Sequence, residues 1–173
     1  SEKLEDKMLN ILRISGDTVV SKDTEYSDVI IYVEPEASFS IAEGVSITLT
    51  RAGIVNNGKL VISKNSIITT RMSDGGTFGI YSSNRFDMRN ATIKDVQFIS
   101  LSKEMLSHIV DNDTLSKCEK AIMKKYAKSI SFISAEIVSI RDSVLKNIQQ
   151  PDWWAIVNAT NVSISETIIE GCN

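Results

Sequence analysis

Two similar segments near the end of the chain decide the fold: VSIRDSVL at residues 138–145 and VSISETII at residues 162–169. Each has apolar residues at its first, third and eighth positions, and the two segments start 24 residues apart. Three earlier copies of this apolar pattern start at residues 47, 60 and 86, the last two 26 residues apart. The apolar positions of these earlier copies are Ile47/Leu49/Ile54, Leu60/Ile62/Ile67 and Phe86/Met88/Ile93.

A repeat with a period in the twenties, short β segments and polar corners is typical of a solenoid, in which stacking buries the apolar face of each unit. Residues 29–49 alternate apolar and polar positions, which predicts strands with one buried face, interrupted near Pro35 and Gly44. A β-sandwich of hairpins is the alternative, but Asn57-Gly58 is the only turn of the Asn-Gly type. The sequence therefore predicts an all-β chain that folds as one right-handed parallel β-helix.

Two segments depart from the β pattern. Residues 3–13 have an apolar stripe at helical spacing, which predicts a short helix in an N-terminal region of residues 1–16. Residues 102–128 predict a helical insertion, in which Ser116 and Glu119 match a capping box. The predicted single domain covers residues 1–173, with β coils at 17–101 and 129–173. The stripe of the N-terminal helix consists of Leu4, Met8, Ile11 and Leu12.

Composition excludes several classes of protein. A hydrophobic fraction of 42% and a net charge of −3 indicate a folded chain that does not hold nucleic acid by bulk electrostatics. Cys118 and Cys172 are too few for a disulfide framework. No apolar run approaches the ~18 residues of a membrane helix, and the charged first residues do not match a signal peptide. We expect no nucleic-acid partner, membrane span, metal or cofactor.

Residues 32–47 (YVEPEASFSIAEGVSI) and 53–60 (GIVNNGKL) resemble the opening coils of the pectin-lyase-like right-handed β-helix superfamily, and Gly79-Ile80-Tyr81 resembles its middle coils. The resemblance covers about residues 17–100 and 130–173. It implies a parallel β-helix in which a helix, here residues 3–13, caps the N-terminal end. It does not imply one function, because the superfamily includes lyases, hydrolases, phage tailspikes and adhesins.

The catalytic motifs of these enzymes are missing from the sequence. The Asn-Thr-Asp run, Asp-Asp pair and Gly-His-Gly of polygalacturonase-type hydrolases do not occur, and the only histidine, His108, lies in the predicted insertion. No motif identifies the calcium cluster of a pectate-lyase-type site. No catalytic residue is therefore carried over from the superfamily.

Two sets of side chains are candidates for a site. Arg85, Asp87 and Arg141 fall on the predicted outer face, where they could form a carboxylate–guanidinium site or only weak surface ion pairs. Trp153 and Trp154 could stack on sugar rings, although adjacent strand residues point to opposite faces and one should lie in the core.

The fold signal without a catalytic motif predicts a non-catalytic glycan-binding or structural module of a surface, secreted or virion (tailspike-like) protein. The alternative is a polysaccharide lyase or glycoside hydrolase that uses the Arg85, Asp87 and Arg141 face. The last repeat ends at Ile169 with no covering segment after it. This predicts either a fragment of a longer chain or a C-terminal coil buried in a homo-oligomeric contact.

Overall fold

Parallel strand pairing organises the chain in the computed structural model, which describes residues 9–71, 75–151 and 155–172. Every strand pairing among these residues is parallel. One sheet has ten strands and two sheets have three each, ordered β15-β12-β9 and β2-β4-β6. The three-stranded sheets consist of β2 (Asp17–Val20), β4 (Ser38–Ile41), β6 (Lys59–Val61), β9 (Arg85–Arg89), β12 (Ile137–Arg141) and β15 (Asn161–Ser165).

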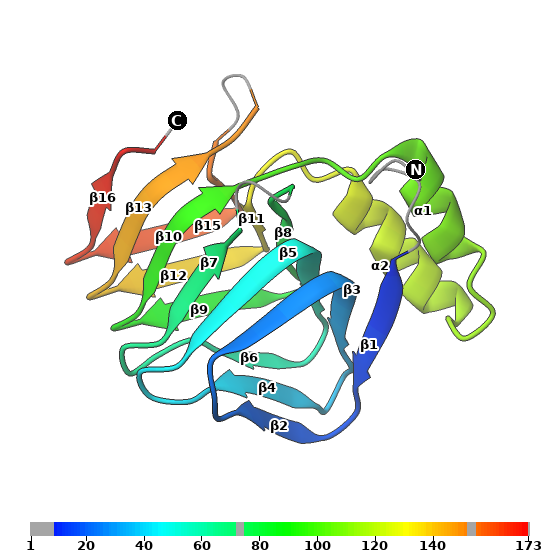
Figure 1. The fold of residues 1–173 in the computed structure, drawn as a ribbon, viewed down its shortest axis with the longest axis horizontal. Coiled ribbons are helices and arrows are strands. Elements are labelled where there is room, and N and C mark those ends of the chain that lie inside the picture. The colour runs from blue at the N-terminus through cyan, green and yellow to red at the C-terminus, as the bar shows by residue number, and fades with distance from the viewer. Residues whose placement is uncertain (1–8, 72–74, 152–154, 173) are drawn as a thin grey trace.

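The ten-stranded sheet has the order β14-β11-β8-β5-β7-β10-β13-β16, and β3 joins β1 to β5 beside this path. Figure 1 shows its strands in a curved series from β3, in blue at the centre of the molecule, to β16, in red at the upper left. It consists of β1 (Asn10–Ile14), β3 (Thr24–Val33), β5 (Ser46–Asn56), β7 (Ile67–Thr70), β8 (Thr77–Ser82), β10 (Thr92–Gln97), β11 (Ile133–Ser134), β13 (Val144–Gln149), β14 (Val157–Asn158) and β16 (Ile168–Glu170).

The prediction of a single right-handed β-helix is wrong. The described residues form separate parallel sheets that curl like half a barrel, and they do not form a single solenoid. The large sheet divides at β5, since residues 46–49 pair with β7 and residues 52–56 pair with β8. Arg51 lies between these halves with a φ of 45°, and this left-handed residue bends the strand towards two partners. The repeat identified most of the buried positions, but it carried no information about this division.

The predicted N-terminal helix is also wrong over its described part. Residues 1–8 lie outside the described residues, but Asn10–Ile14 is strand β1 and pairs with residues 29–33 of β3. Ile14 is 6% exposed and lies opposite Val33, which is fully buried. Pairing with a buried strand outweighed the helical spacing of Ile11 and Leu12, because tertiary contacts override local propensity.

Two short helices lie where the helical insertion was predicted, at Lys103–Val110 (α1) and Lys117–Ala127 (α2). The capping box of α2 is confirmed: Glu119 N–H donates to Ser116 Oγ at 3.1 Å, and Ser116 N–H donates to Glu119 Oε1 at 2.8 Å. Figure 1 shows both helices together at one side of the sheets, next to β1. Their apolar face packs on the outward side chains of the large sheet, including Ile30, Tyr32 and Val55.

Gly53 in β5 makes room for the contact between α2 and the sheet, and Gly79 in β8 supplies a carbonyl to it. Tyr126 of α2 is 3% exposed, and its hydroxyl donates to the Gly79 carbonyl at 3.1 Å. A Cβ on Gly53 would lie 1.8 Å from Tyr126 Oη and 2.8 Å from the Gly79 oxygen. The lack of a side chain on Gly53 therefore allows the tyrosine to approach the sheet backbone.

Gly53→Ala should lower the free energy of unfolding by about 1–3 kcal/mol, because the added methyl group displaces Tyr126 from a packed interface. Gly16→Ala is the matched control, since a Cβ there has no atom within 4 Å and should change stability little. Urea unfolding of both variants measures the difference. Equal stability of the two variants would contradict this account of how α2 docks.

Most apolar repeat positions lie in the interior, but Ile67 is only half-buried and the last copy is exposed at Val162, Ile164 and Ile169. Ile62, Met88 and Ile140 are at most 2% exposed, whereas Ile164, which was also predicted to be buried, is 38% exposed. Ile140 lies between Met88 and Ile164 in register, while Ile164 belongs to β15, which pairs only with β12 among the described strands. One neighbouring strand instead of two explains the exposure of Ile164.

Ile140→Asp should unfold the protein or cost about 3–5 kcal/mol, because it places an uncompensated charge in an apolar interior. Ile164→Asp is the control in the same column, where water reaches the carboxylate and the cost should be much smaller. Circular dichroism during urea unfolding, at low protein concentration, compares the two. A similar loss of unfolding free energy in both variants would mean that the strand register does not determine which side chains are buried.

Candidate functional site

The outer face of β9 carries three alternating charged side chains. Phe86 and Met88 are 1% exposed and point inward, so Arg85, Asp87 and Arg89 point outward. The Arg85 Nε donates to both Asp87 carboxylate oxygens, at 2.8 and 2.6 Å. Both side chains remain about half exposed, so water screens this ion pair.

A groove of about 350 Å³ runs between this face and the segment that contains β6. Residues 58–63 form one side of the groove, and Arg85, Asp87 and Arg89 form the other. Among the described lining residues, Lys59, Arg85 and Arg89 are cationic and Asp87 is the only carboxylate. An isolated bridge between Ile62 and Met88 joins the two sides beneath the groove. The charge balance of the groove lining favours an anionic ligand over a cationic one.

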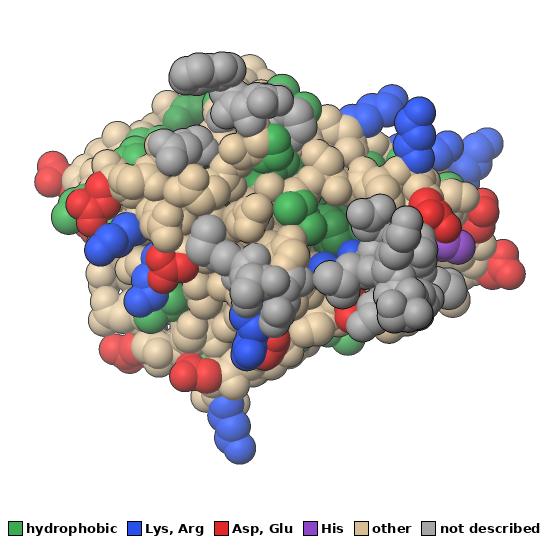
Figure 2. Space-filling model, turned by 45° about the horizontal axis from the view of Figure 1, so that its top comes forward, with side chains coloured by type: hydrophobic (Ala, Val, Ile, Leu, Met, Phe, Trp, Pro, Cys, Tyr) green, Lys and Arg blue, Asp and Glu red, His purple; other side chains and the backbone are tan. Residues whose placement is uncertain are grey.

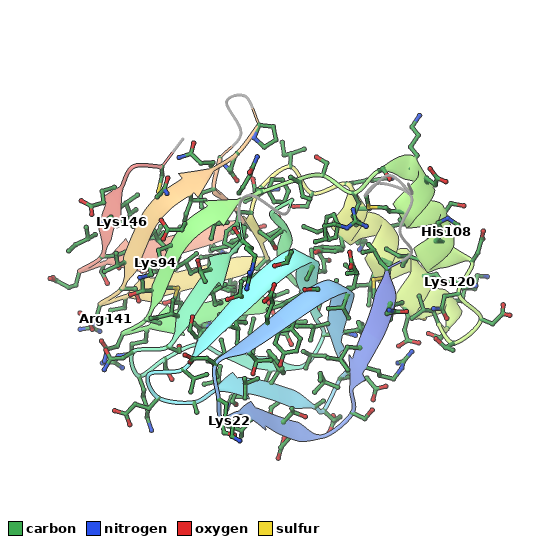
Figure 3. All side chains as sticks on the ribbon, viewed as in Figure 1. Lys22, Lys94, His108, Lys120, Arg141 and Lys146 are labelled. Atoms are coloured by element: carbon green, nitrogen blue, oxygen red, sulfur yellow. The ribbon has the colours of Figure 1, made fainter. Side chains whose placement is uncertain are left out.

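The structure brings only part of the predicted Arg85, Asp87 and Arg141 set together. In the parallel register Asp87 lies beside Ser139, while Arg141 lies beside Arg89. The Arg141 Nε is 3.5 Å from the carboxylate of Asp142. Arg141 therefore extends the row of guanidinium groups along the outer face, and it is not the register partner of Asp87. Figure 3 labels Arg141 at the left edge of the molecule.

Other predicted candidates lie elsewhere or outside the described residues. Trp153 and Trp154 lie outside them. His108 is in the last turn of α1, on the opposite side of the molecule from Arg141 in Figure 3. No group of three or more histidine, cysteine or acidic side chains in the described ranges could hold a metal ion. In the same ranges neither helix is long and apolar enough to cross a membrane.

A second groove, of about 340 Å³, is lined in part by Ser82, Ser83 and Ser134, whose side chains already form hydrogen bonds. Asn56 donates to Ser82 Oγ at 3.2 Å, and Ser83 Oγ donates to Asn57 Oδ1 at 2.6 Å. These bonds link successive strands, so a structural role accounts for these serines.

The surface in Figure 2 has basic and acidic side chains interspersed at its left end, and its largest blue group lies on the upper right.

A charged cluster that no sequence pattern predicted lies where the helices meet the sheets. The Arg13 Nη1 donates to Glu34 Oε1 at 2.8 Å and to Glu119 Oε2 at 2.5 Å, and its guanidinium lies 5.4 Å from the centre of the Tyr32 ring. The hydrogen bond from Arg13 is the main cause that lowers the pKa of Glu119 below its usual value. The hydrogen bonds from Arg13 to Glu119 and Glu34 also raise the pKa of Arg13.

This cluster clamps the helical insertion to β1. No local pattern could reveal it, because Arg13 and Glu119 are 106 positions apart. The only partial signal was the capping box, which identified Glu119 as a helix-start residue. All three charges have partners in the fold, so a structural role accounts for the cluster.

No protein-family model, curated protein or solved structure matches this chain. The resemblance to the pectin-lyase-like superfamily therefore stays a prediction.

The Arg13 clamp predicts a pH dependence of stability. Because the folded-state pKa of Glu119 is depressed, its contribution is complete above its unfolded-state pKa and is lost as the pH falls through the folded-state value. Arg13→Gln should therefore destabilise the protein at about pH 7 and less at about pH 3.5, which lies below the unfolded-state pKa of Glu119. Urea unfolding at both pH values measures this.

Lys146→Gln is the control, since it removes a cation from an exposed 3.6 Å pair with Glu170 and should have little effect at either pH. A destabilisation by Arg13→Gln that is equal at both pH values would show that the ion pair with Glu119 does not stabilise the fold.

Proposed function

We propose that this chain is a non-catalytic module that binds acidic glycans in the groove between β6 and β9. The observation that carries the proposal is the lining of that groove, with three cations and one carboxylate on a rigid strand scaffold. Guanidinium groups pair well with carboxylates and sulfates, because they offer several donors in one plane. An exposed groove with such a lining suits a uronate-containing or sulfated polysaccharide.

The outer face beyond the groove supports an extended ligand. Arg89 and Arg141 are register neighbours on β9 and β12, and Ser139 and Ser163 continue the row that starts at Asp87. Neighbouring strands lie about 4.8 Å apart, so these side chains offer donors at a regular spacing along the stack. A surface, secreted or virion protein is the setting that we propose for this module.

The geometry around Asp87 supports binding over catalysis. Glycoside hydrolases generally use two carboxyl groups that flank the scissile bond. Asp87 is the only carboxylate among the described groove residues, and both of its oxygens accept a hydrogen bond from Arg85. A carboxylate held in this way is suited to orienting the arginine.

The proposal predicts that acidic polysaccharides bind and neutral ones do not. Calorimetric titration with a panel of bacterial polysaccharides should show binding that weakens as salt is added, because the contacts are charged. Arg89→Gln should weaken the binding at least ~5-fold, since it removes a charge-assisted hydrogen bond. Lys120→Gln is the charge-matched control and should leave the affinity unchanged. Figure 3 shows Lys120 on the side of the molecule opposite Arg141.

The same incubations test for a lyase or hydrolase. New reducing ends or unsaturated uronate absorbance that disappear in Asp87→Ala would contradict the non-catalytic proposal. Equal binding of neutral and acidic polysaccharides, or an Arg89→Gln affinity equal to that of wild type, would show that the groove is not the site.

A further inference from the structure

The second groove crosses three neighbouring strands of the large sheet. It is lined by three successive residues at the ends of β8, β11 and β14: residues 81–83, 134–136 and 158–160. The middle residue of each triplet turns its side chain inward, because Ser82 is 1% exposed and Ala135 and Ala159 pack against the core. The first and third residues therefore point outward and form the two walls of the groove.

These walls carry an aromatic ring and three polar side chains that the fold does not use. Tyr81 is half-buried, and its ring meets that of Tyr126 edge-on at 6.5 Å. Glu136, Asn158 and Thr160 are exposed, and their side chains form no hydrogen bond or ion pair with any residue that the structure describes. In contrast to the serines of the same groove, these groups are available to a ligand.

The chemistry of the second groove suits a neutral ring that carries several hydroxyl groups. Glu136 is the only charged side chain among its described lining residues, which disfavours an anion. The Glu136 carboxylate accepts hydrogen bonds, while Asn158 and Thr160 both donate and accept them. The apolar face of Tyr81 can pack against the C–H groups of a sugar ring. A volume of about 340 Å³ falls within the range of roughly 300–1,000 Å³ of small-molecule sites.

The second groove adjoins the groove between β6 and β9. That groove runs along the strands, and Gly58 and Arg85 lie at one of its ends. Ser83 of the second groove is two residues before Arg85, a separation of at most about 7 Å. The Ser83 Oγ also donates to Oδ1 of Asn57, the residue before Gly58, at 2.6 Å. One ligand can therefore extend from the first groove into the second.

We infer that the two grooves are adjoining parts of one glycan site, and that the bound polysaccharide carries a neutral sugar next to its acidic one. This inference rests on the proposed function, in which the acidic sugar lies between β6 and β9. The neutral sugar packs on Tyr81, and its hydroxyl groups bond to Glu136 and Asn158. A second uronate in this position would face the Glu136 carboxylate, with no cation among the described lining residues to offset the repulsion.

Calorimetric titration with two acidic polysaccharides tests the inference. In hyaluronan a uronate alternates with a neutral N-acetylhexosamine, whereas polygalacturonate consists of uronates alone. Hyaluronan oligosaccharides should bind at least ~5-fold more tightly than polygalacturonate oligosaccharides of the same length, because only hyaluronan fills the second groove. Polygalacturonate carries more charge, so attraction by charge alone would produce the reverse order of affinities.

Asn158→Ala should weaken hyaluronan binding about 5-fold, as the loss of one hydrogen bond predicts, and leave polygalacturonate binding unchanged. Asn10→Ala is the matched control, since Asn10 is exposed on β1 and lines neither groove. The inference is wrong if hyaluronan binds no more tightly than polygalacturonate, or if Arg89→Gln weakens the binding of both polymers while Asn158→Ala weakens neither. In both cases the groove between β6 and β9 remains the site. If Arg89→Gln weakens neither polymer, the proposed function fails and the inference fails with it.

Discussion

Phe86 pairs with Val138 and Val138 pairs with Val162, so that apolar side chains stack in a column across three successive parallel strands. Full burial of each aliphatic or aromatic side chain contributes about 1.5–3 kcal/mol. Because side chains alternate between the two faces of a strand, a shift of one residue would move a whole set of apolar groups into water. This in-register stacking therefore determines which side chains lie in the interior, which line the outer groove, and which are exposed on β15.

The corners between strands maintain the same register. Asn90, Asp142 and Glu166 follow β9, β12 and β15, and all three have φ values near 50°. Asn and Asp tolerate this left-handed conformation better than most residues, and Glu166 is the exception among the three. Asp95 and Asn147 form a second series of left-handed residues, which bends the strands of the large sheet. The Asn147 Nδ2 donates to Asp95 Oδ1 at 2.9 Å. Turning at equivalent positions keeps each column of apolar side chains aligned.

The sequence predicted the parts of the molecule that depend on the repeat. Aligning its copies identifies Ile62, Met88 and Ile140 as buried, and the same alignment places Arg141 beside Arg89 and not beside Asp87. The division of the strands among sheets could not be inferred, because it depends on a backbone bend at Arg51. The Arg13 clamp was equally hidden, since its partners meet only after β1 and α2 have formed.

Solution NMR can test the in-register parallel stacking most directly, since cross-strand nuclear Overhauser effects report which residues lie opposite one another. The account predicts that residues 137–141 contact residues 85–89 on one side and 161–165 on the other, with both contact series running in the same direction along the chain. Contact series that run in opposite directions, as in antiparallel hairpins, would contradict the stacking on which the interior and the groove both depend.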